Sequence, residues 1–485
     1  MPSSENRSHD DDPDRDRIRD LCSAFLALQA QARSNQALRD EIAAMQASHS
    51  WRLTEPLRQL RRWLGPAKAT MPALQPADAG LPLGPLRDAS ELLVYRAAPG
   101  GALALPVAQR PRQLLVDVTE LARADLGAGV QRVVHRILLE LVLDPPAGFR
   151  VEPVRIAAEG QYVHARAFLA RLLGIGEDAV GADRPVLAQA GDQFLGLDLI
   201  RDRAALARDA LLAMKANGVS MAFVVFDVLP LQRPDWFPDG MDARFRQWLR
   251  LVAECGDQAL CISESVCRDM RATLATESPN STISLASFPL GADLDSWLPP
   301  VAGLPGPPPG TARFLMVGTV EMRKGHAQAL DAFEQLWAKG VPCELLIAGH
   351  AGWLVEELIE RLRHHPQAGK RLHWIEGGGD ANLLAAYRDS SALLAASWGE
   401  GFGLPLVEAA ASGLPILARD IPVFREVAGR GADFFRGESG AELAAAIQDW
   451  LQRWRAGNIA DPLEVSLSSW RQSAGVLKTL LERDP

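Results

Sequence analysis

The sequence is poor in cysteine and has no cysteine pair with metal-binding spacing. Its five cysteines are odd in number, and none of them forms a Cys-x-x-Cys pair, which argues against a thiolate metal site. This pattern predicts reduced thiols in the core of a cytoplasmic protein. The cysteines are Cys22, Cys255, Cys261, Cys267 and Cys343.

Long apolar runs and a surplus of basic residues are also missing. No stretch of about 18 uncharged apolar residues is present, and the acidic Asp10–Asp12 segment is unlike a secretion signal, so no membrane-spanning segment is expected. A formal net charge of −9 argues against a nucleic-acid partner. With 485 residues and 48% hydrophobic content, the chain can form two ordinary domains plus extensions.

A strand, a glycine-rich turn and a helix are predicted around residue 400. The small and apolar run Ala392–Ala396 favours a strand that is buried on both faces. Gly401 and Gly403 then allow the backbone to turn sharply and to approach a ligand closely, and Pro405 suits the first turn of a helix. The N–H groups at such a helix start can seat a phosphate.

Two glutamates frame this turn. We expect Glu400, at the strand end, to direct its carboxylate to sugar hydroxyls, and Glu408, about one helical turn after Pro405, to reach a ribose. Carboxylates suit both tasks because they accept hydroxyl hydrogen bonds strongly. The alternative is that Glu408 only complements the helix dipole and that Glu400 is solvated.

The segment from Glu400 to Glu408 resembles the signature of the family 4 retaining glycosyltransferases, which have the two-Rossmann GT-B fold. The likeness continues in residues 317–326 and 411–418. The resemblance implies a nucleoside-diphosphate sugar as the donor substrate, no further cofactor, and a diphosphate that Arg323 and Lys324 neutralise. A solvated surface pair is the alternative for these two cations.

The resemblance has two departures. Many relatives carry Arg where this chain has Thr319, so either Arg323 compensates or fewer charges hold the diphosphate. Relatives often carry His where this chain has Phe226, so a histidine role in positioning the donor sugar cannot be transferred. The next residue, Asp227, follows a predicted strand and is the functional candidate of the first domain, because ligand clefts lie at strand ends; an ordinary capping Asp is the alternative.

Residues 117–134 resemble the opening of a glycosyltransferase subgroup in which a Thr/Ala-Gly-Val/Ile-Gln-Arg-Val-Val segment follows the first strand. There Gly129 could let a phosphate approach the backbone, although such loops also serve as plain tight turns. His350 follows a predicted strand whose end faces the cleft, and a plain surface position is the alternative for it. Together, the catalytic candidates are Arg323, Lys324, Glu400 and Asp227, and the donor-binding candidates are Gly129, Gly318, Thr319, His350, Ile375, Leu383, Tyr387, Gly401, Phe402, Gly403, Leu404 and Glu408.

The predicted fold is α/β and GT-B, with two Rossmann-like domains and a cleft between them. Residues 112–300 form the acceptor domain, residues 301–465 the nucleotide-sugar domain, and residues 466–485 a helix that crosses back to the first domain. Asp293 and Asp295 have the spacing of a metal pair known in another glycosyltransferase class, but they precede a proline-rich hinge, so we expect no metal. The predicted strands are 114–118, 221–226, 259–262, 314–317, 345–348, 372–375, 392–396 and 416–418.

The first 111 residues precede these domains. Residues 1–64 are predicted to be a helical extension and residues 65–111 a Pro/Gly/Ala-rich linker. Apolar spacing over residues 17–46 indicates either a coiled coil that joins two copies or a helix packed on its own domain. Residues 51–64 predict a basic amphipathic helix for a membrane surface or for docking, and they resemble a segment appended to bacterial cell-surface polysaccharide glycosyltransferases.

The predicted reaction is the transfer of a sugar, with retention, from a nucleoside-diphosphate sugar to a saccharide or lipid-linked acceptor in cell-surface polysaccharide (O-antigen or capsule) synthesis, at the inner face of the membrane. Two alternatives remain: a catalytically degenerate scaffold or sugar-binding module, and a sugar-nucleotide epimerase or hydrolase. A nicotinamide-dependent dehydrogenase is disfavoured, because no Gly-x-Gly-x-x-Gly joins a first strand to its helix.

Overall fold

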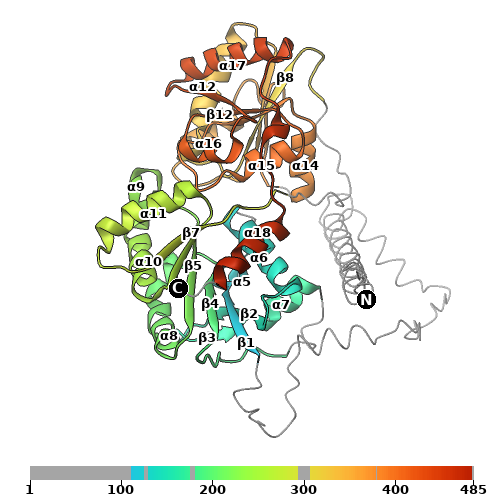
Figure 1. The fold of residues 1–485 in the computed structure, drawn as a ribbon. Helices are drawn as coiled ribbons and strands as arrows, with labels where there is room; N and C mark the ends of the chain where they lie inside the picture. The colour runs from blue at the N-terminus through green and yellow to red at the C-terminus, as the bar shows by residue number, and fades with distance from the viewer. Residues whose placement is uncertain (1–110, 125–128, 175–180, 293–305, 378, 483–485) are drawn as a thin grey trace, which may run out of the picture. The chain divides into compact units, whose positions relative to one another are not determined.

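The computed structural model describes residues 111–482 except for 125–128, 175–180, 293–305 and 378 (Figure 1). The sequence predictions for residues 1–110 and for the Asp293–Asp295 pair lie outside the described residues and stay predictions. The chain divides into two compact units, of which the larger contains both β-sheets. The smaller unit includes helix α7 (Arg166–Leu173), in which Leu169, Ala170, Leu172 and Leu173 are buried.

Seven strands form the first sheet. They are β1 (Arg112–Asp117), β2 (Phe149–Ile156), β3 (Tyr162–His164), β4 (Gln193–Gly196), β5 (Ser220–Val225), β6 (Gln258–Cys261) and β7 (Ser284–Ser287). Their order in the sheet is β3-β2-β1-β4-β5-β6-β7, and all neighbours are parallel except β2 and β3. Leu114, Leu115 and Val116 of β1 are fully buried, as is typical of parallel strands that are covered on both faces.

The helices that connect these strands bury one apolar face each. In the fifteen-residue helix α10, Phe245, Trp248, Leu249 and Val252 are buried at helical spacing. Ser263 caps the following helix, because its Oγ accepts the Val266 N–H at 3.1 Å. The elements are α5 (Thr119–Arg123), α6 (Gly129–Leu143), η3 (Arg201–Arg203), α8 (Ala204–Ala216), α9 (Leu229–Gln232), η4 (Pro234–Trp236), α10 (Met241–Cys255) and α11 (Glu264–Glu277).

Six strands form the second sheet, and all of its neighbouring pairs are parallel. They are β8 (Ala312–Val317), β9 (Cys343–Ala348), β10 (Leu372–Ile375), β11 (Ala392–Ala395), β12 (Ile416–Arg419) and β13 (Asp433–Phe435). Their order is β10-β9-β8-β11-β12-β13. Strand β8 therefore lies beside β11, which brings the segments that follow these two strands to the same edge of the sheet.

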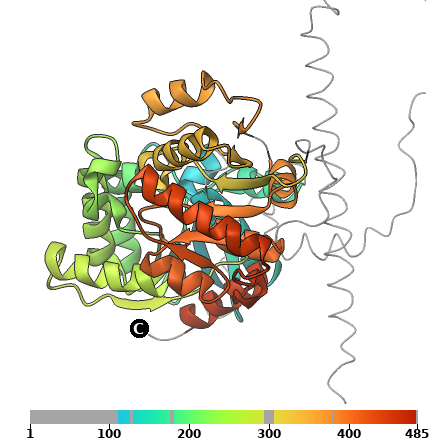
Figure 2. The same ribbon diagram turned by 90° about the horizontal axis from the view of Figure 1, so that it is seen from above.

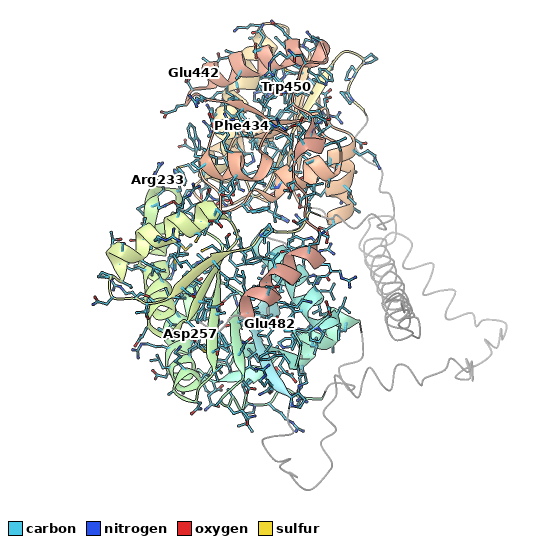
Figure 3. The ribbon with its side chains drawn as sticks, viewed as in Figure 1. Arg233, Asp257, Phe434, Glu442, Trp450 and Glu482 are labelled. Carbon is cyan, nitrogen blue, oxygen red and sulfur yellow. The ribbon has the colours of Figure 1, made fainter. Side chains whose placement is uncertain are left out.

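Aromatic side chains fill the core of the second sheet. The Phe314 ring lies 5.6 Å from Phe333 and 5.3 Å from Trp450 between centroids, and Trp450 Nε1 donates to Asp433 at 2.9 Å. Trp450 is labelled in Figure 3. Helices α12 and α17 lie side by side (Figures 1 and 2). The elements are η5 (Met322–Lys324), α12 (His326–Ala338), α13 (Glu356–Arg363), α14 (Asp380–Arg388), α15 (Leu404–Ala411), α16 (Pro422–Ala428), α17 (Gly440–Arg455) and η6 (Pro462–Glu464).

The last described helix, α18 (Trp470–Leu481), packs against α6 of the first sheet. Lys478 pairs with Asp144 at 2.5 Å, and the Leu481 carbonyl accepts a hydrogen bond from Gln193 at 2.9 Å. None of the described helices combines the length and the hydropathy needed to cross a bilayer.

All eight predicted strands are present. The ends differ slightly: Val118, Phe226, Ile262 and Ala396 were predicted inside strands but lie just after them. The prediction missed β2, β3, β4, β7 and β13.

Candidate functional site

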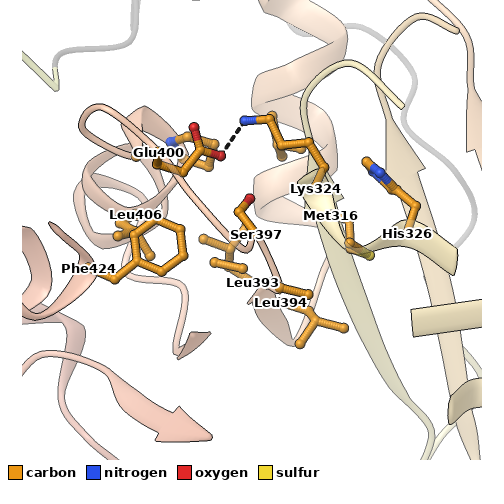
Figure 4. A pocket seen from close by; sticks show the side chains of 14 residues that line it. Met316, Lys324, His326, Leu393, Leu394, Ser397, Glu400, Leu406 and Phe424 are labelled. Atoms are coloured by element: carbon orange, nitrogen blue, oxygen red, sulfur yellow. Dashed lines mark hydrogen bonds and ion pairs between the residues drawn. The ribbon is translucent and has the colours of Figure 1, made fainter. Parts of the chain in front are cut away.

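Glu400 lies between two cations that follow a neighbouring strand. It comes after β11, whereas Arg323 and Lys324 form the short helix η5 after β8. Lys324 Nζ lies 2.5 Å from Glu400 Oε1, and Arg323 NH1 lies 2.9 Å from Glu400 Oε2. Figure 4 shows the Lys324 side chain extended to the Glu400 carboxylate. The structure thus brings three of the four predicted catalytic residues into direct contact.

The two cations keep Glu400 ionised. Burial alone would raise the pKa of Glu400, but Lys324, Arg323 and a hydrogen bond from Ser397 lower it to about 2. Arg323 is held on further sides by Glu321 at 2.8 Å and by the Gly399 carbonyl at 3.1 Å. Burial opposes the charge of Arg323, but Glu400 and Glu321 raise its pKa.

Asp227 belongs to the same electrostatic cluster. It follows β5 of the first sheet, and its Oδ1 accepts the Leu229 N–H at 3.1 Å. Burial raises the pKa of Asp227, whereas the charge of Arg323 opposes that shift. Glu321 behaves in the same way: burial raises its pKa, and Arg323 opposes the rise. Three carboxylates, those of Asp227, Glu321 and Glu400, therefore surround two cations.

The glycines of the predicted turn serve the packing of the chain. A Cβ on Gly401 would lie 1.8 Å from the Phe226 carbonyl oxygen, and Ser263 Oγ donates to the Gly401 carbonyl at 2.7 Å. The close approach at Gly401 is thus made to another segment of the chain, whereas the sequence led us to expect an approach to a ligand. Gly403 has a φ of +97°, which favours glycine.

Helix α15 starts directly after Gly403, with Leu404 and Pro405 in its first turn as predicted. Pro405 fits there because the first helical N–H groups have no intrahelical acceptor. Phe402 is 7% exposed and packs into the core. This start leaves the first-turn amides of α15 close to the end of β11, from which Glu400 follows.

Glu408 of α15 is buried and already has two partners. Its side chain is 3% exposed, the Tyr387 hydroxyl donates to Oε2 at 2.7 Å, and the Arg132 guanidinium lies 2.7 Å from Oε1. Tyr387 is buried and fixes this carboxylate. Each oxygen of the Glu408 carboxylate thus has a partner within the chain, at the position where the sequence predicts a ribose.

Sequence reasoning missed Arg132. It lies in the first turns of α6, three residues after Gly129, the first residue of that helix. The segment around it was recognised as resembling a glycosyltransferase subgroup, but nothing local in it indicates a contact with Glu408, which is far away in the chain. Burial opposes the charge of Arg132, but Glu408 and Asp380 raise its pKa.

Other predicted donor-binding residues gather at the ends of β8, β9 and β10. Gly318 and Thr319 follow β8, and a Cβ on Gly349, after β9, would lie 2.0 Å from the Gly318 carbonyl oxygen. The Ile375 carbonyl accepts the Gly349 N–H at 3.0 Å. His350 is exposed, and Thr319, Ile375 and Leu383 of α14 are half-buried.

A water-sized cavity of about 20 Å³ lies behind the Lys324–Glu400 pair (Figure 4). His326, Ser397 and Phe424 are among the residues that line it. Burial and the charge of Lys324 lower the pKa of His326 to about 3, so its imidazole is neutral at physiological pH. Among the described residues, no three His, Cys, Asp or Glu side chains form a cluster that could hold a metal ion.

A family model described as "Glycosyl transferases group 1" matches residues 305–459, the segment that carries Arg323, Lys324, Glu400 and Glu408. The chain also matches the serotype-specific mannosyltransferase WbdA of Escherichia coli with 40% identity over 380 residues. The matched segment belongs to the family 4 glycosyltransferases. The match to WbdA covers 76% of this chain and 46% of WbdA, so the chain spans about half the length of that relative.

The alignment with a second relative is shorter. The chain is 34% identical over 145 residues to the phosphatidyl-myo-inositol mannosyltransferase of Mycobacterium tuberculosis, and this match covers 29% of the chain and 36% of the relative.

Comparison with solved structures shows the fold of the chain. HepE of Anabaena, in complex with UDP and glucose, has a TM-score of 0.51 at 14% identity and is matched over 76% of this chain and 95% of its own. Sucrose-phosphate synthase of Thermosynechococcus elongatus has a TM-score of 0.50 at 14% identity, over 76% of this chain and 98% of its own. The predicted α/β GT-B fold with two Rossmann-like domains is confirmed.

Proposed function

We propose that this chain is a retaining glycosyltransferase that moves a sugar from a nucleoside-diphosphate donor to a hydroxyl of a saccharide or lipid-linked acceptor in cell-surface polysaccharide synthesis. The observation that carries the proposal is the Arg323–Lys324–Glu400 cluster at the strand ends of a family 4 fold. Because the curated relatives are named mannosyltransferases, mannose is the first donor sugar to test.

The cluster suits electrostatic catalysis of this reaction. Glu400 would turn to the sugar hydroxyls, and the two cations that it now neutralises would face the leaving diphosphate, whose negative charge grows as the glycosidic bond breaks. The diphosphate would accept the proton of the incoming hydroxyl. Such preorganised cations are effective because burial strengthens their interaction with the developing charge.

Asp227, which follows β5, adds a carboxyl group from the first sheet to the cluster. Its raised pKa follows from burial, and its place beside Arg323 and Glu400 fits a role in orienting the sugar or the acceptor. We further propose that the reaction takes place at the cytoplasmic face of the membrane, with residues 51–64 as the surface contact. Liposome co-sedimentation tests that contact: equal pelleting of a variant with Arg61, Arg62 and Trp63 changed to Ala would contradict it.

Thermal denaturation with a panel of GDP-, UDP-, ADP- and dTDP-sugars, including GDP-mannose, tests the function. We expect stabilisation by one nucleotide class and a smaller shift in Glu408→Ala. Stabilisation with acceptor-dependent release of the nucleoside diphosphate would support a transferase. Donor consumption without an acceptor would instead favour an epimerase or hydrolase. The absence of any shift would favour a degenerate scaffold.

A further inference from the structure

Glu408 and Arg132 form an ion pair at the place where the nucleotide is proposed to bind. The pair joins α15 of the second sheet to α6 of the first over 2.7 Å. Arg132 also approaches Asp380 at 3.9 Å. With Tyr387 on its other oxygen, the buried Glu408 carboxylate offers little room for another donor.

The cations of the catalytic cluster are already matched by acids. Lys324 pairs with Glu400, and Arg323 pairs with both Glu400 and Glu321. Thr319, which the sequence placed beside the diphosphate, adds no charge. A doubly charged diphosphate would therefore enter a cluster whose two cations already have carboxylate partners. It needs a further cation to balance its charge.

We propose that Arg132 is a donor-binding residue that exchanges partners: it neutralises Glu408 when no nucleotide is bound, and it binds the donor diphosphate when the ribose takes Glu408. This inference rests on the proposed function. The ribose hydroxyls replace the hydrogen bonds that Glu408 loses, and the guanidinium fork matches phosphate oxygens. Arg132 is able to move, because its side chain is 23% exposed and rotates about several bonds.

Arg136, one turn further along α6, provides a matched comparison. It lies 3.5 Å from Asp380. The proposal assigns the exchange to Arg132, whose guanidinium contacts Glu408. Opening a buried ion pair is costly unless both charges find new partners, so the Arg132–Glu408 pair opens only for a ligand that offers hydroxyls to Glu408 and phosphate oxygens to Arg132.

The test is isothermal titration of wild-type and Arg132→Gln protein with GDP, UDP, ADP and dTDP, and with the nucleoside of the base that binds. We expect Arg132→Gln to weaken binding of the diphosphate by about tenfold or more. Binding of the nucleoside should stay unchanged or tighten, since Glu408 loses a competitor. Arg136→Gln, the control, should bind both ligands as the wild type does.

Other outcomes would overturn the proposal in distinguishable ways. Equal weakening for diphosphate and nucleoside would mean that Arg132 only positions Glu408, and unchanged affinities would remove it from the site. A wild-type chain that binds none of the nucleotides would refute the proposed function itself. If Arg132→Gln does not fold, Arg132→Lys is the alternative variant, because it keeps the positive charge without the two-pronged guanidinium. Its diphosphate affinity should fall several-fold, and its nucleoside affinity should not change.

Discussion

The carbonyl oxygen of Phe226 occupies the space in which a side chain on Gly401 would begin. A Cβ at that position would lie 1.8 Å from this oxygen, a distance that no substitution can keep without moving the backbone. Phe226 follows β5 of the first sheet and Gly401 follows β11 of the second. Their contact therefore fixes the backbone next to Glu400 against the first sheet.

Gly401→Ala is expected to reduce activity more than stability. The added methyl group must push the backbone away from Phe226 and with it the adjacent Glu400, and overpacking of this kind destabilises by about 1–3 kcal/mol. Sugar transfer and thermal denaturation should be measured on the same preparation. Gly475→Ala is the control: a Cβ there meets nothing within 4 Å, and Ala in helix α18 should stabilise slightly. Wild-type activity in Gly401→Ala would contradict the expectation.

Glu400→Gln is expected to separate binding from turnover. Because the pKa of Glu400 is about 2, the substitution removes a full negative charge at neutral pH and leaves Arg323 and Lys324 with less compensation. The nucleoside diphosphate product should then bind about tenfold more tightly, while kcat falls by about tenfold or more. Inhibition by the nucleoside diphosphate and steady-state kinetics measure the two effects.

A surface carboxylate provides the control for that experiment. Glu376→Gln removes the same charge from a site that is 41% exposed and paired with Arg363, and it should leave both quantities unchanged. An unchanged product affinity in Glu400→Gln would show that the carboxylate does not restrain the two cations.

The sequence located the strands that are buried on both faces, because their apolar runs are uninterrupted. It missed strands without such runs: β3 has three residues, and β7, Ser-Leu-Ala-Ser, is exposed at its first residue and only half-buried beyond it. The meeting of Glu400 with Lys324 could be predicted, because both follow strands of one parallel sheet and belong to recognisable motifs.

Contacts between the two sheets were not predictable from local sequence. Arg132 pairs with Glu408, and Phe226 meets Gly401, only because the folded chain brings distant segments together. A single sequence carries no signal for such pairs. Motifs identified which residues are special, but the partners of Glu408 and Gly401 required the structure.

Glu426 of α16 caps helix α11 of the first sheet, and its removal should loosen that helix start. Its carboxylate accepts the Glu264 N–H at 2.7 Å, the Ser265 N–H at 2.8 Å and the Ser265 hydroxyl at 2.6 Å. Glu426→Ala should destabilise by about 1 kcal/mol and speed amide hydrogen exchange in the first turn of α11. Glu442→Ala, which opens the capping box of α17, should speed exchange in α17 alone; protection of α11 that survives loss of Glu426 would refute the cap.

Asp117, at the end of β1, is expected to make stability fall as pH rises. Burial raises its pKa to about 7, and this outweighs the hydrogen bonds from Thr119 and Tyr162 that lower it. The Thr119 N–H donates to Oδ1 at 2.8 Å, and the Tyr162 hydroxyl donates to Oδ2 at 2.7 Å. The folded state therefore binds a proton that the unfolded state, with a pKa near 3.8, releases.

The sign of the effect follows from this proton. Between pH 4 and 7 the folded state binds more protons than the unfolded state, so each unit of pH removes up to about 1.4 kcal/mol. Chemical denaturation from pH 4 to 8 should show that wild type loses stability relative to Asp117→Asn, by a total on the order of 4 kcal/mol, and that the difference levels off above pH 7. In Tyr162→Phe, which removes a hydrogen bond that favours the ionised form, the decline should extend to higher pH. A stability difference between wild type and Asp117→Asn that stays constant across this range would mean that Asp117 is ionised in the folded protein.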